Sequence, residues 1–243
     1  MSKIYKKINI KIISTLDRWI ANFIRFILPG ANPPGYLRGF GGYVLSAAGI
    51  QKDSLVYSFG VGSNIDFEEK LSEKFECGVF MFDPTPPALE LVSSKHLPPL
   101  LLFEPIGVWT KSGTLKFYTD GKTDKERKRN FSLTNFFKTD TFIEAQCLTL
   151  SEIMRNHGHT HIDLLKVDIE GAAIDVLTDM LNQKIFPNQI VGEVEIPKLR
   201  YKATPLDIIK ISNKKRELLK KIELSGYRVF TYNKGEFTAL RKF

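Results

Sequence analysis

Three charged residues alternate within an otherwise apolar run of the chain, LLKVDIEGAAID at residues 164–175. Lys166, Asp168 and Glu170 are two residues apart, so their side chains would share one face of a β-strand. A buried charge is unfavourable unless it is paired or takes part in chemistry. A carboxylate can accept the proton of a reacting hydroxyl, and we expect Lys166 to be the counter-ion of these acids. The alternative is an ion pair that only anchors the end of the strand.

A second pair of acids, Glu193 and Glu195, alternates in the same way within NQIVGEVEI at 188–196. Neighbouring carboxylates that are shielded from water raise one another's pKa, which makes one of them a better base. We therefore expect Asp168 or Glu195 to act as a base or to orient an acceptor. Together with Glu170, these acids could also supply oxygen ligands to a divalent metal. Their spacing is not specific to a metal, and we predict none.

A glycine-rich turn follows an earlier apolar run, SLVYSFGVGSN at 54–64. Gly60 permits a tight turn and Gly62 a close backbone approach, and the start of the next helix offers free N–H groups. Asp83 ends the following strand and is placed to accept hydrogen bonds from ribose hydroxyls. The alternative for this acid, which precedes Pro84, is an Asx-turn. The glycine turn and the acid end successive strands, and together they indicate a cofactor that contains adenosine.

A histidine-rich run, HGHTHI at 157–162, precedes the strand that carries Lys166. The run therefore falls at the amino end of that strand, whereas ligands of open α/β sheets bind at the carboxyl ends. We predict a surface turn here rather than a metal site.

From Leu55 onward, strand-like apolar runs alternate with helix-like segments. This order predicts a parallel sheet that is covered by helices on both faces. The last run, 227–243, has two alternating strands around Asn233-Lys234-Gly235 and predicts an antiparallel hairpin. We therefore predict an α/β doubly wound sheet, mostly parallel, with a C-terminal antiparallel hairpin. The glycines and acids described above would meet at its carboxyl edge.

The choice of cofactor depends on the glycine turn and the hairpin. The turn lacks the third glycine of the dinucleotide fingerprint, and a reversed last strand suits a seven-stranded methyltransferase sheet. LLKVDIEGAAIDVL resembles the signature of the FkbM-type S-adenosylmethionine-dependent methyltransferases. VYSFGVGSNIDFEEKL, MFDPTP and PIGVW are similar to a methyltransferase-like branch of that family, in the expected order. The resemblance covers roughly residues 50–243.

The resemblance implies a class I methyltransferase, Rossmann-like fold with S-adenosyl-L-methionine as the cofactor. It also implies transfer of a methyl group to a hydroxyl of a sugar, a glycan or a related small molecule. Asp168 and Glu170 would face the methyl group and the acceptor. The residues that the resemblance implies at the cofactor are Gly60, Gly62, Ser63, Asn64, Asp83, Pro84, Ile106, Gly107, Val108 and Trp109.

Three positions depart from the family pattern. Ser58 stands where many methyltransferases have an aspartate, so the ammonium group of the cofactor would rely on backbone carbonyls or on another acid. Glu195 stands where the family often has a histidine, and Ala173 replaces a glutamate of the signature. A carboxylate would therefore take the place of the histidine as a base.

The overall composition is that of a globular protein: 243 residues, 43% hydrophobic and 26% charged. Two cysteines give no disulfide framework, and we expect a cytoplasmic protein. The net charge of +8 lies partly in the basic runs 122–130 and 213–221. Such runs are solvated surfaces, or they attract an anionic partner. We expect an acidic or phosphate-linked acceptor and, because RNA-binding and zinc signatures are lacking, no nucleic acid.

The first 49 residues are predicted to form an amphipathic helix and a linker rich in proline and glycine, ahead of a methyltransferase domain over 50–243. Asp17 and Arg18 interrupt the apolar run, which is therefore neither a membrane span nor a signal peptide. The helix would pack on the domain, or residues 1–28 would contact a membrane surface. Two other functions stay open: a non-catalytic, methyltransferase-like scaffold or membrane-associated module, and a nicotinamide-dependent oxidoreductase.

Overall fold

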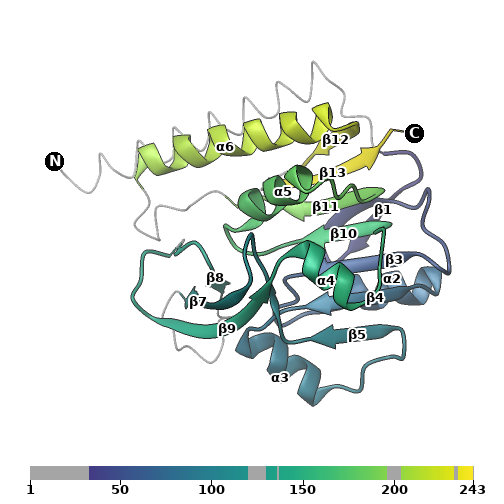
Figure 1. Cartoon of the computed structure of the whole chain (residues 1–243). Helices are drawn as coiled ribbons and strands as arrows, with labels where there is room; N and C mark the ends of the chain where they lie inside the picture. The colour runs from purple at the N-terminus through teal and green to yellow at the C-terminus, as the bar shows by residue number, and fades with distance from the viewer. Residues whose placement is uncertain (1–32, 120–129, 136, 196–203, 233–234, 243) are drawn as a thin grey trace, which may run out of the picture. The chain divides into compact units, whose positions relative to one another are not determined.

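The structure is a computed structural model that describes residues 33–119, 130–135, 137–195, 204–232 and 235–242 (Figure 1). Residues from Pro33 onward form one compact unit. The predicted N-terminal helix, its membrane contact and most of the basic run 122–130 lie outside the described residues, so they stay predictions.

Seven strands form the central sheet in the order β12-β13-β11-β10-β3-β4-β5. They are β3 (Leu55–Phe59), β4 (Gly78–Phe82), β5 (Leu101–Glu104), β10 (Leu164–Val167), β11 (Gln189–Glu193), β12 (Tyr227–Thr231) and β13 (Glu236–Arg241). The pairs from β5 to β11 are parallel, whereas β13 is antiparallel to both β11 and β12. The predicted α/β class with a mostly parallel sheet is confirmed. The reversed strand is one position in from the edge.

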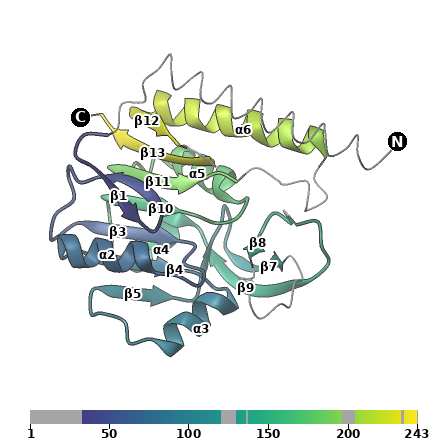
Figure 2. The ribbon, with the colours of Figure 1, turned by 180° about the vertical axis from the view of Figure 1, so that it is seen from behind.

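Helices cover both faces of this sheet, because its strands are apolar on both sides. One core joins the strands to α4, α5 and α6, and the other joins them to α2 and α3. Figure 1 shows α4 and α5 in front of the sheet, and Figure 2 shows α2 from the opposite side. The helices are α2 (Asp66–Phe75), α3 (Pro86–Ser94), α4 (Leu150–Asn156), α5 (Ala173–Asn182) and α6 (Pro205–Leu224).

A smaller sheet, β6-β9-β7-β8, follows β5 in the chain. Its strands are β6 (Gly107–Val108), β7 (Gly113–Thr119), β8 (Phe131–Ser132) and β9 (Phe142–Leu148). Phe117, Phe131 and Cys147 form its core. The apolar run PLLLFEPIGVW is divided between the two sheets. Pro105 lies at the break and has no N–H to continue a ladder.

Part of the predicted linker has regular structure, because residues 36–46 form a hairpin of β1 (Tyr36–Phe40) and β2 (Tyr43–Ser46). Glycine at 41 and 42 provides the left-handed backbone of its turn. Tyr43 and Leu45 are buried in the core that contains α2. The amide of Gln189 on β11 bonds to both backbone polar groups of Ser46, at 2.6 and 3.2 Å. The compact unit therefore begins at Pro33 and not at residue 50.

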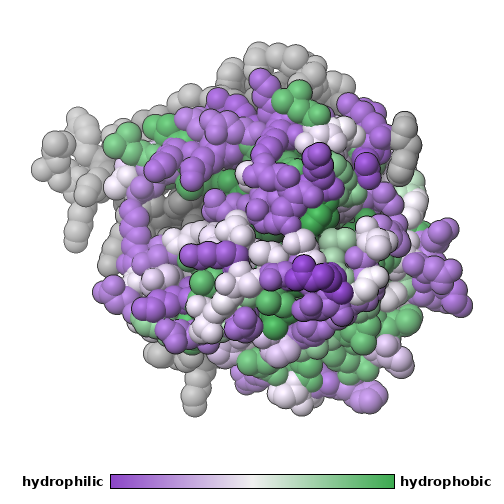
Figure 3. All heavy atoms as spheres, viewed as in Figure 1, coloured by the Kyte–Doolittle hydropathy of each residue, from purple (hydrophilic) through white to green (hydrophobic). Residues whose placement is uncertain are grey.

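The described surface combines polar side chains with apolar areas. Apolar residues gather over α3 and β5 (Figure 3), where Leu89, Leu100 and Leu102 are exposed. In the ranges that the structure describes, no helix has both the length and the apolarity needed to cross a membrane.

Close packing of β11 gives a prediction about stability. A Cβ added at Gly192 would lie 2.7 Å from the Val167 carbonyl oxygen and 3.2 Å from the Phe237 ring. Gly192→Ala should therefore lower the free energy of unfolding by about 1–3 kcal/mol, as overpacking does. Urea unfolding measures this loss. Gly78→Ala is the matched control, since its Cβ would meet nothing nearer than 4.0 Å. Equal stability of the two variants would contradict the prediction.

Candidate functional site

A cavity of about 260 Å³ lies at the carboxyl ends of β3, β4 and β10. It contains almost all of the residues that the sequence predicted at a cofactor, together with Lys166, Asp168 and Glu170. The predicted residues that line it are Gly60, Gly62, Ser63, Asn64, Asp83, Pro84, Gly107 and Val108. Ile106, Trp109 and Glu195 are not among its lining residues.

The glycine turn after β3 and the segment after β10 touch each other directly. Gly60 has a φ of +84°, and a Cβ there would lie 1.7 Å from the carbonyl oxygen of Asp168. The Asp168 N–H donates to the Phe59 carbonyl at 3.0 Å. Gly62 also has a positive φ, +59°, but a Cβ there would meet nothing within 4 Å. Gly60 is thus required by the fold, whereas Gly62 leaves open space beside the cavity.

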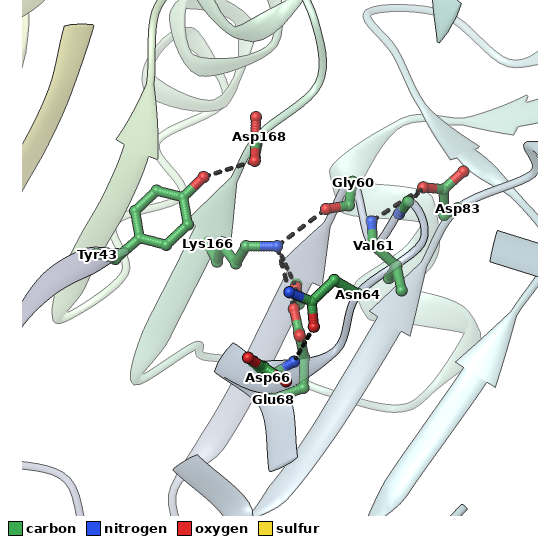
Figure 4. Close-up of polar contacts among 11 residues, drawn as sticks. Tyr43, Gly60, Val61, Asn64, Asp66, Glu68, Asp83, Lys166 and Asp168 are labelled. Atoms are coloured by element: carbon green, nitrogen blue, oxygen red, sulfur yellow. Dashed lines mark hydrogen bonds and ion pairs between the residues drawn. The ribbon is translucent and has the colours of Figure 1, made fainter. Parts of the chain in front are cut away.

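Asp83 holds the glycine turn in place. Its Oδ2 atom accepts hydrogen bonds from the N–H groups of Val61 and Gly62, at 2.9 and 2.8 Å (Figure 4). Its Oδ1 atom accepts from the Thr85 N–H at 2.8 Å, which is the Asx-turn that the sequence offered as an alternative. A carboxylate has about four acceptor positions, so Oδ1 retains one for a ligand hydroxyl. The turn and a ligand contact are therefore compatible.

Lys166 does not pair with the acids of its own strand, contrary to the prediction. Its ammonium lies 3.1 Å from the carboxylate of Glu68 on α2 and donates to the Gly60 carbonyl at 2.9 Å. Its third contact is the Ser58 hydroxyl at 3.4 Å, and that hydroxyl donates to Glu68 at 2.5 Å. All three ammonium protons of Lys166 are used in this way. Lys166 thus belongs to a buried ion pair that joins β10 to α2.

Asp168 is paired instead with Tyr43, a residue of the hairpin that the sequence did not single out. The Tyr43 hydroxyl donates to Asp168 Oδ2 at 2.6 Å (Figure 4). Burial, then the charge and hydrogen bond of Asp168, raise the pKa of Tyr43 above its ordinary range, so its proton stays on the phenol. Among the described residues, Asp168 Oδ1 has no hydrogen-bond donor. One oxygen of this carboxylate is therefore available in the cavity.

Glu195 lies on the far side of the turn that follows β10. Its Oε2 atom accepts from the Gly171 N–H at 2.8 Å, and it lines a second cavity rather than the first. Burial, followed by the charges of Glu170 and Asp168, raises the pKa of Glu195 well above its ordinary range. Glu195 does not line the first cavity, because the Glu170–Gly171 turn separates it from that space, and its role as a base or acceptor-orienting group stays a prediction.

The smaller sheet supplies a wall that the sequence missed. Phe117, Asn130, Phe131 and Leu133 line the first cavity opposite the glycine turn. A Cβ at Gly107 would lie 2.7 Å from both the Phe117 ring and the Cys147 sulfur, so glycine permits this close packing. The run GTLKFYTD alternates as a strand does, but nothing in it shows which cavity its rings would line.

The residues present fit S-adenosylmethionine. Phe117, Phe131 and Val108 offer apolar surface for the adenine ring, and Asp83 offers a hydrogen-bond acceptor for the ribose hydroxyls. Asp66 and Asp168 bring acid groups to the cavity, which suits the positive ammonium and sulfonium groups. Within the described ranges, no group of three or more acidic, histidine or cysteine side chains could hold a metal.

A comparison with known protein families gives a match over most of the chain. The family described as "Methyltransferase FkbM domain" matches residues 49–229, which is most of the chain. A search of curated proteins found no match to this chain.

Solved structures give distant likenesses only. The fibrillarin pre-rRNA processing protein of Methanococcus jannaschii is 12% identical, with a TM-score of 0.44 over 81% of this chain and 70% of that one. The precorrin-6y C5,15-methyltransferase of Geobacter metallireducens GS-15 is also 12% identical, with a TM-score of 0.40 over 79% and 82%. Human N-acetylserotonin methyltransferase, in complex with S-adenosylmethionine, is 10% identical, with a TM-score of 0.37 over 79% and 48%.

The Lys166–Glu68 pair gives a prediction about folding. Lys166→Met leaves the buried Glu68 carboxylate without its cation and should lower the free energy of unfolding by about 3–5 kcal/mol. The double variant Lys166→Met/Glu68→Leu should regain most of that loss, because neither charge remains. Urea unfolding measures both. Lys52→Met, which breaks the exposed pair with Glu76, is the control and should change stability by less than about 1 kcal/mol. Additive losses in the double variant would contradict the prediction.

The raised pKa of Glu195 gives a prediction about pH. The folded protein keeps a proton that the unfolded chain loses above about pH 4.3, so this residue lowers stability as the pH rises above that value. Glu195→Gln cannot titrate and keeps an acceptor for the Gly171 N–H. Its free energy of unfolding should therefore fall less than that of the wild type between about pH 4.5 and 7. Urea unfolding at several pH values tests this, with the exposed Glu144→Gln as control. Parallel curves for wild type and Glu195→Gln would refute it.

Proposed function

The chain belongs to the FkbM methyltransferase family, whose cofactor is S-adenosylmethionine, and we propose that it methylates a hydroxyl oxygen of a sugar or related small molecule. The first cavity is the proposed cofactor site. Asp83 would hold the ribose, and Gly62, Ser63 and Asn64 would border the methionine part. Asp66 would meet the ammonium group, since Ser58 and the Gly60 carbonyl are already bonded to Lys166.

The observation that carries the proposal is the Tyr43–Asp168 hydrogen bond inside this cavity. When bound, S-adenosylmethionine supplies a methyl group on a positively charged sulfur. An acceptor hydroxyl must lose its proton as its oxygen takes up that methyl group, and a nearby carboxylate assists. Tyr43 holds one oxygen of Asp168 and leaves Oδ1 to receive the proton. Because the Lys166 ammonium is paired with Glu68, it does not compete with the acceptor hydroxyl for that oxygen.

The Tyr43–Asp168 pair also supports methyl transfer to an oxygen atom, because it can hold the acceptor molecule in one orientation. Transfer requires the acceptor oxygen to lie close to the methyl group and in line with the breaking bond. A hydrogen bond from the acceptor to Asp168 Oδ1 would orient that oxygen, and Glu170 lies beside it in the cavity lining. A hydroxyl donates such a bond, which is why we propose O-methylation.

Two measurements test this function. S-adenosylhomocysteine at millimolar concentration should raise the melting temperature of the protein, because it binds the native state. Sugars and glycans incubated with S-adenosylmethionine should gain one methyl group, detected by mass spectrometry. Asp168→Asn should keep the thermal shift and lose about 10²- to 10⁴-fold in turnover, the range for loss of a general base.

Control variants separate this role from general effects. Tyr43→Phe should also reduce turnover while keeping the thermal shift, because Asp168 loses its positioning bond. Asp140→Asn removes an exposed acid outside both cavities and should change neither quantity. Absence of a thermal shift in the wild type would overturn the proposed function, and full turnover of Asp168→Asn would overturn the role of Asp168.

A further inference from the structure

A second cavity of about 260 Å³ lies behind the Glu170–Gly171 turn, between the first turn of α5 and the first half of α6. Gly171 and Thr134 line it, while their neighbours Glu170 and Leu133 line the first cavity. The two cavities therefore share one thin wall at the carboxyl edge of the sheet. The family assignment and the first cavity leave this space without a role.

Two lysines of α6 face this cavity. Lys210 and Lys214 are one helical turn apart and exposed, and they form no ion pair with any residue in the described ranges. The other charges of the lining are largely accounted for. Lys138 pairs with Asp207 at 2.7 Å, and Asp175 is the remaining acid besides Glu195. The cavity thus presents two lysine charges that are available to an anion.

The start of α5 adds backbone donors on the opposite wall. Ala172 is its N-cap and provides no side-chain hydrogen bond to the first turn. Gly171, Ala173, Ile174 and Asp175 line the cavity, so the positive end of this helix borders it. An uncapped helix start favours an anion through its N–H groups and its dipole.

A buried oxygen of Glu195 completes the site. Its Oε1 atom is buried and has no hydrogen-bond partner in the described part of the chain, while Oε2 accepts from Gly171. A buried polar atom without a partner is unfavourable and indicates a missing group. The raised pKa of Glu195 agrees with a protonated carboxyl that can donate to a ligand oxygen. Val194, Ile174 and Ile211 supply apolar wall between these polar groups.

We propose that the second cavity binds a phosphate group of the acceptor, so that the substrate is a sugar phosphate or a phosphate-linked glycan. Lys210, Lys214 and the start of α5 would hold the phosphate, and Glu195 would donate to a sugar oxygen. The acceptor hydroxyl would reach past the Glu170–Gly171 turn to Asp168. This inference rests on the proposed function only in taking the bound phosphate to be part of the acceptor.

Calorimetric titration tests the site on the full chain at about 0.15 M salt, where weak surface attraction is screened. The probes are glucose 1-phosphate, inorganic phosphate and glucose. Glucose 1-phosphate should bind more tightly than glucose. The variant Lys210→Ser/Lys214→Ser should weaken its binding by about 10- to 100-fold, the effect expected when charge-assisted contacts are lost.

The matched control is Arg216→Ser/Lys220→Ser, which removes two exposed charges with the same spacing from the same helix but outside the cavity. Its affinity for glucose 1-phosphate should equal that of the wild type. Equal losses in the two double variants would reduce the effect to net charge and overturn the proposal. Failure of both phosphate probes to bind the wild type would also overturn it.

The thermal shift with S-adenosylhomocysteine keeps this test separate from that of the proposed function. Both double variants should retain the shift, since neither touches the first cavity. Phosphate binding without any shift would count against the proposed function and leave the anion site intact. A normal shift without phosphate binding would count against the anion site alone.

Discussion

The arrangement of the site depends on the contact between the Gly60 turn and the Asp168 carbonyl. β3 and β10 are neighbours at the centre of the sheet, and their carboxyl ends approach so closely that no side chain fits at residue 60. The groups of the first cavity are attached to this contact. Asp83 bonds to the two N–H groups after Gly60, Lys166 bonds to its carbonyl, and Tyr43 bonds to Asp168. A shift of either turn would therefore displace the acids as well as the backbone.

The second constraint is the distribution of charge across that contact. Lys166 lies on β10 and Asp168 directly follows that strand, so an ion pair between them would have neutralised the acid that we propose as the base. Glu68 prevents this, because its buried carboxylate takes the ammonium of Lys166 on the side of α2. Asp168 is left with a neutral partner, the Tyr43 phenol. A positive sulfonium would therefore enter a cavity in which Asp168 is bonded to a phenol and forms no ion pair with a lysine of the described residues.

The sequence predicted the elements better than the contacts between them. Alternating apolar runs predicted the parallel sheet, and the glycines and acids at strand ends predicted its cofactor edge, because both depend on local pattern. Tyr43 and Glu68 depend on tertiary packing. Glu68 stands on a buried helix face beside Ile65, Leu71 and Ser72, and a lone acid there could have indicated a buried cation. Tyr43 gave no such sign, since a run rich in glycine and proline does not predict a hairpin that reaches β10.

Asp168 and Glu195 follow neighbouring strands, β10 and β11, and yet they line different cavities because the turn after β10 lies between them. The turn after β10 brings Glu170 into the left-handed region, with a φ of 21°, a conformation that is unfavourable for a residue with a side chain. Ser132 donates to the Glu170 carbonyl on one side, and Glu195 accepts from Gly171 on the other. These two hydrogen bonds offset the unfavourable backbone conformation and fix the position of the turn between the cavities. Glu195 therefore positions the residues that line the first cavity, while its side chain also lines the second.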